Sequence, residues 1–156
     1  MRVGHGFDVH PFTDDPDRVL VLGGVTFPGE RGLRGHSDAD VLAHACADAL
    51  LGAAGLGDLG RHFPDSDPQW AGADSLALLA EVVRLVGAAG WTVANVDCTV
   101  VAEAPRIAPH REAMEAALST AAGAPVSVKA TTAEGLGAIG RGEGIAAQAV
   151  ALLTVP

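Results

Sequence analysis

Short runs of apolar residues, several of them bounded by glycine or proline, predict a series of strands. Residues 1–10 predict the first strand, and residues 19–22 and 25–27 predict a hairpin about Gly23 and Gly24. In a strand over residues 92–101, Val96, Cys98 and Val100 fall on one face. The remaining predicted strands are residues 126–130 and 145–154.

Longer segments with apolar residues three and four apart predict helices. The first is expected to begin at Ser37, which forms a capping-box-like start with Asp40, and to end near Ala54 before Gly55. The other helices are expected over residues 74–89 and 109–122, with Pro109 in the first turn of the latter. The apolar stripe expected in the helix over residues 74–89 consists of Leu76, Leu79, Val83 and Val86.

The order of these elements favours an α/β or α+β layer, because strands and helices alternate. Residues 56–72 have no clear period and are expected to form a long loop, as are the glycine-rich residues 135–144. No repeat or linker divides the sequence, so we expect one domain over residues 1–156.

Composition and charge narrow the classes of function. Hydrophobic residues make up 49% of the 156 residues but aromatic residues only 4%, so Ala, Val and Leu must build the core. The net charge of −9 argues against binding to nucleic acid or to an anionic membrane surface. No apolar run is long enough to span a membrane, and the N-terminus lacks a signal-peptide core, so we expect a cytoplasmic protein. Cys46 and Cys98 are expected to be buried, reduced thiols.

The first strand ends with a pair of candidate metal ligands, Asp8 and His10. Side chains two apart on a strand point to the same face, so these two can bind one ion. The best third ligand is His44 on the first predicted helix. One carboxylate and two imidazoles suit zinc and leave a fourth position open.

Asp40, His44 and Asp48 recur every four residues and therefore share one side of that helix. The alternative interpretation is a solvated polar face. Residues 36–40 are small or polar, and a helix N-terminus here would offer an anion site. Asp38 and Asp40 would then lie in the first turn, where simple capping also explains them. Asp48 would either accept a hydrogen bond from a ligating histidine or lie exposed.

Further polar clusters follow, each with an ordinary structural alternative. Residues 58–67 are rich in oxygen ligands, but turns also favour aspartate. Thr131, Thr132 and Glu134 follow a strand and could hold phosphate oxygens and a second divalent cation, or form a hydroxyl-based turn or cap. The glycine-rich segment is neither a Walker loop nor a Rossmann fingerprint, and its Arg141 and Glu143 could simply pair.

Taken in order, these motifs closely resemble the 2-C-methyl-D-erythritol 2,4-cyclodiphosphate synthase family. The resemblance extends over nearly the whole chain. It rests on residues 4–10, 36–41, 44, 48–53, 57–60, 63–65, 129–132 and 140–144.

The resemblance implies a mixed β-sheet with helices packed on one face and a homotrimer with an active site at each subunit junction. It implies an enzyme, a lyase of non-mevalonate isoprenoid biosynthesis. The substrate would be 4-diphosphocytidyl-2-C-methyl-D-erythritol 2-phosphate, and the products the cyclic diphosphate and CMP. Neither a nucleic acid nor a membrane is an expected partner.

The resemblance also assigns site residues. Asp8, His10 and His44 would hold one Zn²⁺ per subunit, Glu134 would help hold a second cation, Mg²⁺ or Mn²⁺, and His36 and Thr132 would be catalytic. The implied substrate contacts comprise Asp8, His10, His36, Ser37, Asp58, Leu59, Gly60, Phe63, Pro64, Asp65, Ser66, Asp67, Ala102, Glu103, Ala104, Pro105, Arg106, Ile107, Ala108, Thr131, Thr132, Ala133, Glu134, Ala138 and Arg141.

One position departs from the family pattern. The family often has an aromatic residue where this chain has Ala138, so a stacking role is weakened there. Ring closure between two anionic groups needs positioning and charge stabilisation, which the cations, Lys129, Arg141 and helix N–H groups would supply. The alternatives are a zinc phosphohydrolase and a noncatalytic trimer that binds a nucleotide or an isoprenoid diphosphate.

Overall fold

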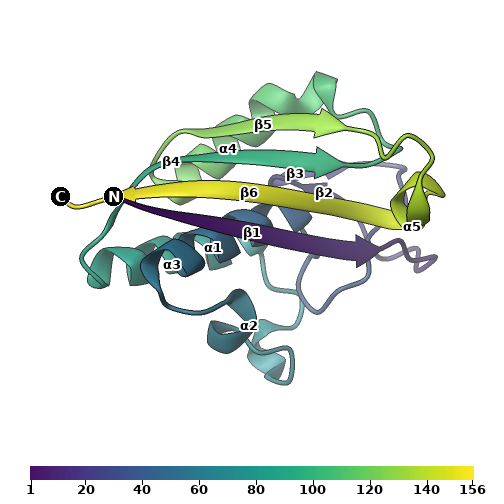
Figure 1. Ribbon diagram of the computed structural model, residues 1–156. Helices are drawn as coiled ribbons and strands as arrows, with labels where there is room; N and C mark the ends of the chain where they lie inside the picture. The colour runs from purple at the N-terminus through teal and green to yellow at the C-terminus, as the bar shows by residue number, and fades with distance from the viewer.

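The computed structural model describes residues 1–156 as a four-stranded sheet with helices on one face (Figure 1). The strand order is β1-β6-β4-β5. Strands β1 (Arg2–Pro11) and β4 (Thr92–Val101) run antiparallel to β6 (Gly144–Thr154), whereas β5 (Val126–Thr131) runs parallel to β4. This mixed sheet with helices on one face confirms the expected fold class.

The remaining elements surround this sheet. Strands β2 (Leu20–Leu22) and β3 (Val25–Phe27) form the predicted hairpin. The α-helices are α1 (Val41–Ala54), α2 (Leu59–His62), α3 (Ser75–Ala88), α4 (Arg111–Ala122) and α5 (Gly137–Gly140), and the 3-10 helices are η1 (Pro68–Trp70) and η2 (Ala108–His110). None of these helices has the length and apolar character that a membrane crossing requires.

Helix α1 begins later than the sequence predicts. Ala39 has a φ of 60°, a left-handed conformation that interrupts any helix from Ser37. Asp40 is therefore the N-cap, and its Oδ1 accepts the N–H groups of Leu42 and Ala43 at 3.1 and 3.2 Å. The expected first-turn placement of Asp38 and Asp40 is wrong, whereas the predicted end at Gly55 is confirmed.

The predicted loop over residues 56–72 contains two short helices, so that prediction is wrong in part. Asp58 caps α2 by accepting the N–H of Arg61 at 2.9 Å, and Asp67 caps η1 by accepting that of Gln69 at 3.0 Å. Helices this short arise from local capping and have no hydrophobic period for sequence analysis to detect. Helix α5 interrupts the predicted glycine-rich loop in the same way.

The buried stripe of α3 also differs from the prediction. Leu79 and Val86 are buried as expected, but Leu76 and Val83 are only half-buried. Leu78 and Val82 are buried in addition, because α3 packs against both α1 and α4 and so buries a wider face. The helix still lies beside α1, where its first residue reaches the candidate metal site.

Two glycines allow α1 to lie directly on the sheet. A Cβ atom on Gly4 would lie 2.0 Å from the carbonyl oxygen of Ala49, and one on Gly6 would lie 1.9 Å from that of Ala45. Both are on the face of β1 that also carries Asp8 and His10. The close approach places α1, and with it His44, beside the end of β1.

The core is built of small aliphatic side chains, as the composition predicts. Nearly every residue of α1 is buried, and Cys46 and Cys98 are buried free thiols as expected. The polar side of α1 is not a solvated face, since Asp40 is fully buried and His44 is only 8% exposed. A buried carboxylate and imidazole need specific partners, and the site supplies them.

Candidate active site

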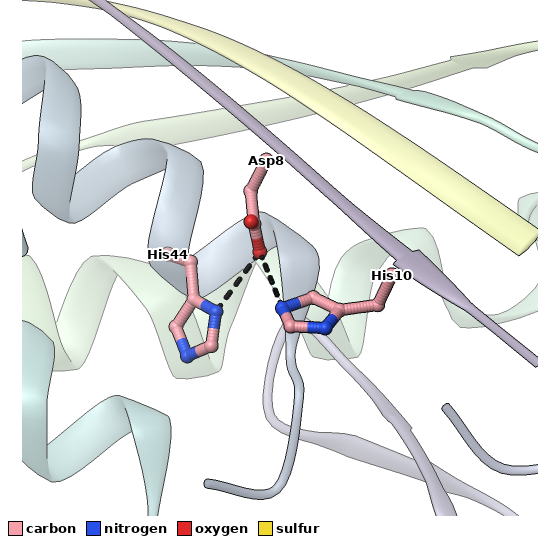
Figure 2. Close-up of side chains that lie close together, drawn as sticks. All are labelled: Asp8, His10 and His44. Carbon is pink, nitrogen blue, oxygen red and sulfur yellow. Dashed lines mark hydrogen bonds and ion pairs between the residues drawn. The ribbon is translucent and has the colours of Figure 1, made fainter. Parts of the chain in front are cut away.

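Asp8, His10 and His44 converge at the end of β1 (Figure 2). The Oδ2 atom of Asp8 lies 3.1 Å from Nε2 of His10 and 2.9 Å from Nδ1 of His44. One ligand atom from each residue lies within 4.8 Å of the others. The strand contributes two of these side chains and the helix the third, so the predicted metal-binding triad is assembled.

The charges in this triad are strongly coupled. Burial alone would raise the pKa of Asp8, but the hydrogen bonds from His10 and His44 outweigh it and lower that pKa to about 2. Burial opposes protonation of His10, yet the hydrogen bond and charge of Asp8 raise its pKa. The site therefore favours an anionic carboxylate facing a positive charge.

The donor set fits a divalent cation such as zinc. His10 donates its Nδ1–H to the carbonyl of Arg34 at 2.7 Å, so its Nε2 faces the Asp8 carboxylate. A divalent cation between them would take the place of the proton on Nε2 and bind both groups. On the far side of His44, Nε2 lies 2.8 Å from Oγ of Ser75. Partners outside the triad are typical of metal-binding histidines.

A cleft of about 570 Å³ opens next to the triad. Gly60 and Pro64 form part of its wall, and its apolar lining residues are Leu59, Phe63, Trp70 and Leu78. The predicted site residues that line it are Asp8, His10, His36, Ser37, His44, Leu59, Gly60, Phe63, Pro64 and Asp65. Its mixed lining suits a small ligand that has both polar and apolar parts.

Some residues predicted for this part of the site have structural roles or lie outside the cleft. Asp58 and Asp67 cap short helices, and neither they nor Ser66 line the cleft. The ring of His36 lies at the cleft with its Nε2 3.2 Å from the Asp67 carbonyl oxygen. Asp67 therefore contributes by orienting His36.

Asp48 also lies in the cleft, and it follows neither of its two expected alternatives. It is half-buried, and its Oδ1 accepts the N–H of Leu59 at 2.7 Å instead of a bond from a histidine. Burial raises its pKa against this hydrogen bond. Asp48 thus fixes the start of α2 against α1 and shapes the cleft wall.

A second cleft of about 410 Å³ lies where β4 and β5 end. The predicted residues in it are Ala102, Glu103, Pro105, Arg106, Ile107, Ala108, Thr131 and Thr132, joined by Ala130 and Arg111. No residue is shared with the first cleft. Strands β1 and β5 form opposite edges of the sheet, which separates the two clefts within one chain.

The remaining predicted residues lie next to the second cleft or outside both. Ala133 donates its N–H to Oε1 of Glu103 at 2.8 Å, and Thr132 donates its hydroxyl to Oε1 of Glu134 at 2.9 Å. Ala104, Ala138 and Arg141 line neither cleft.

The two basic residues expected to supply positive potential are paired with acids. Arg141 pairs with Glu143 at 2.6 Å, the alternative that the sequence left open. Lys129 pairs with Asp97 on the uncovered face of the sheet. Each of them is thus partly neutralised by a neighbouring carboxylate, and their contribution to positive potential at the site stays a prediction.

Sequence analysis missed several residues of the site. Trp70 and Leu78 line the first cleft, and Ser75 contacts His44, but none belongs to a recognisable local motif. Only Asp74-Ser75 gave a signal, as the start of a helix. Their role depends on how α3 packs against α1 and on how η1 places Trp70 at the cleft.

Comparison with known proteins places this geometry in context. Residues 1–154 match the model of the YgbB family. The 2-C-methyl-D-erythritol 2,4-cyclodiphosphate synthase of Moorella thermoacetica is 59% identical to this chain, and the match covers 98% of this chain and 94% of the relative. The synthase of Rubrobacter xylanophilus is 62% identical, and the match covers 97% of this chain and 94% of that relative. The structure of Plasmodium falciparum IspF in complex with CDP aligns with a TM-score of 0.84 at 32% identity, over 99% of this chain and 96% of the other.

Proposed function

The chain belongs to the YgbB family, and we propose that it converts 4-diphosphocytidyl-2-C-methyl-D-erythritol 2-phosphate to 2-C-methyl-D-erythritol 2,4-cyclodiphosphate with release of CMP. This is a step of non-mevalonate isoprenoid biosynthesis. The observation that supports it most is the Asp8, His10 and His44 triad beside a polyol-sized cleft in a chain 59% identical to such a synthase. The reaction class is that of a phosphorus–oxygen lyase.

Asp8, His10 and His44 would hold the zinc ion, which when bound would supply positive charge to the β-phosphate oxygens. His36 would hold the diphosphate at the mouth of the first cleft, with its ring fixed by the Asp67 carbonyl. The apolar lining residues, among them Leu59 and Phe63, would exclude water around the methyl-bearing carbon. These residues keep the 2-phosphate oxygen close to the β-phosphorus.

The second cleft would bind the cytidine monophosphate portion. The structural relative in complex with CDP supports a nucleotide site in this fold. Thr132 would orient the diphosphate through its hydroxyl, and Glu134 would help hold a magnesium or manganese ion that neutralises phosphate oxygens. Glu103 would fix the backbone of this loop through Ala133.

A homotrimer would combine the two clefts. The sheet face opposite the helices exposes apolar side chains, including Val3 at 69% and Phe7 at 51%, with Val9 and Val150 beside them. An apolar face of this kind is typical of an interface between subunits. In a ring of three chains, the metal side of one chain would face the nucleotide side of its neighbour and complete an active site.

The experiment incubates the purified protein, zinc and magnesium with the cytidyl substrate and follows phosphorus NMR. Cyclic diphosphate and CMP are the expected products. A linear phosphate product would instead identify a phosphohydrolase. Tight binding of the substrate without turnover would identify a noncatalytic binding protein. His44→Ala is expected to abolish both stoichiometric zinc and activity, whereas His110→Gln, outside both clefts, is expected to keep both.

A further inference from the structure

A buried cluster of polar side chains lies behind His44, on the side away from Asp8. While Nδ1 of His44 faces the Asp8 carboxylate, its Nε2 lies 2.8 Å from Oγ of Ser75 and 3.1 Å from Oγ of Ser37. Ser75 is the first residue of α3 and is 1% exposed. A buried polar group of this kind has its hydrogen-bond pattern fixed by its neighbours.

Asp38 determines the direction of these hydrogen bonds. Its Oδ1 accepts the Ser75 hydroxyl and the N–H of Asp40, and its Oδ2 accepts the N–H of Ser75 at 3.1 Å. A serine hydroxyl has a single proton, and an anionic carboxylate has none to give. Once Ser75 donates to Asp38, the oxygen of Ser75 can only accept from His44.

Ser37 does not reverse this pattern. Its Oγ accepts the N–H of Ala39 at 3.2 Å and lies 3.4 Å from Oγ of Ser75, to which its own proton can be donated. Both hydroxyl oxygens near Nε2 of His44 therefore act as acceptors. The arrangement favours a proton on Nε2, so that a cation bound between His44 and Asp8 would take the place of a proton on Nδ1.

We propose that Ser75 and Asp38 are positioning residues that hold His44 as the Nε2–H tautomer and thereby make Nδ1 a metal ligand. The proposal rests on the proposed function only in taking the triad as a cation site. Asp38 lies outside the triad, and its negative charge acts through the Ser75 hydroxyl to strengthen the donor character of Nδ1. Loss of such a partner is expected to lower metal affinity by about 10- to 100-fold.

The same site contains an internal reference. His10 has the opposite arrangement, because its Nδ1–H is donated to the Arg34 carbonyl and its Nε2 faces Asp8. The two histidines thus present different nitrogen atoms to the same ion. A change confined to Ser75 or Asp38 is expected to alter His44 and leave the tautomer of His10 as it is.

The test uses protein labelled with ¹⁵N-histidine and saturated with zinc, and records two-bond proton–nitrogen spectra. Wild type is expected to show His44 bound through Nδ1 with its proton on Nε2, and His10 bound through Nε2 with its proton on Nδ1. Ser75→Ala is expected to shift or broaden the Nε2–H signal of His44 alone and to weaken zinc binding, measured by chelator competition, about 10- to 100-fold. Asp38→Asn keeps an oxygen for the Ser75 hydroxyl and is expected to cause a smaller loss.

Thermal unfolding and near-ultraviolet circular dichroism establish whether each variant is folded. If Ser75→Ala does not fold, Asp38→Asn provides the test of the positioning role. An unchanged His44 signal and an unchanged zinc affinity in the folded variants would overturn the proposal. A wild-type protein that shows the expected tautomers and binds zinc but makes no cyclic product would overturn the proposed function instead. The two failures are therefore distinct.

Discussion

Asp40 shows how one buried carboxylate organises the approach to the site. It accepts the N–H groups of Gly23 and Gly24 at 2.8 and 2.7 Å and also caps α1, so it joins the β2–β3 hairpin to the helix that carries His44. Burial raises its pKa to about 6 even though the backbone hydrogen bonds act in the opposite direction. Such a group links folding to pH.

Asp40→Asn tests this link. Between pH ~4 and ~6 the folded chain retains a proton on Asp40 that the unfolded chain releases, so stability falls as pH rises, by up to roughly 3 kcal/mol for this pKa difference. The variant lacks this titration and places an amide N–H₂ against one of the glycine donors. Its destabilisation relative to wild type is therefore expected to be larger at pH 4 than at pH 7.

Urea denaturation of the metal-free proteins at several pH values measures both free energies of unfolding. Other titrating groups cancel in the difference between wild type and variant. A difference that stays constant across this interval, or that increases with pH, would contradict the assignment to Asp40.

At the level of elements, the contact of α1 with β1 decides whether the triad forms. Gly6 has no side chain because the Ala45 carbonyl occupies that space, and Ala45 is adjacent to His44. Helix α1 has no room to move away, because α3 packs on its other side. The metal site thus depends on a glycine that contributes no ligand.

Gly6→Ala is expected to lower the free energy of unfolding by about 1–3 kcal/mol through overpacking and to weaken zinc binding by displacing His44 from Asp8. Gly52→Ala is the matched control, because Gly52 is an exposed position of α1 whose Cβ would lie 4.0 Å from its nearest neighbour. This control is expected to stabilise the helix by about 0.5–1 kcal/mol. Calorimetry measures the stability of both variants, and zinc titration measures their zinc affinity. Equal changes in the two variants would argue against the close-approach explanation.

The sequence was most informative where a local rule governs the structure. The period of two placed Asp8 and His10 on one face, and the glycines at the hairpin and after α1 marked real boundaries. It was least informative where local backbone or tertiary packing decides, as at Ala39, whose left-handed conformation delays α1. Trp70 gave no signal and Ser75 only that of a helix start, because their place in the site arises only when α3 packs against α1 and η1 brings Trp70 to the cleft.

The resemblance to a family added what these patterns could not. Spacing alone left His44 as one possible third ligand, and the structure brings it to 2.9 Å from Asp8. The same resemblance named two groups of substrate residues, yet one chain holds them in separate clefts at opposite edges of the sheet. The proposed homotrimer would account for this division between the clefts.

The uncovered face of the sheet carries exposed apolar side chains that would favour association between chains. Val3, Phe7 and Val9 alternate along β1 with the residues that face α1, so one strand presents an apolar row outward and metal ligands inward. Strand β1 is also an edge strand, with backbone groups available on one side. Association through this face would place the triad close to a neighbouring chain.

Subunit complementation tests whether that neighbour supplies the nucleotide side. His44→Ala disables the metal side of a chain, and Thr132→Ala disables the nucleotide side. If each active site takes one side from each of two adjacent chains, every mixed ring of three has an intact site at about a third of its junctions, because the interface is heterologous. Co-expressed, doubly tagged mixtures of the two inactive variants are then expected to recover roughly that fraction of wild-type activity per ring, whereas Asp8→Ala mixed with His44→Ala recovers none, since both changes lie on the same side. An inactive first mixture in stable, mixed rings would show that both clefts serve one chain, and the interface would then have to be explained by stability alone.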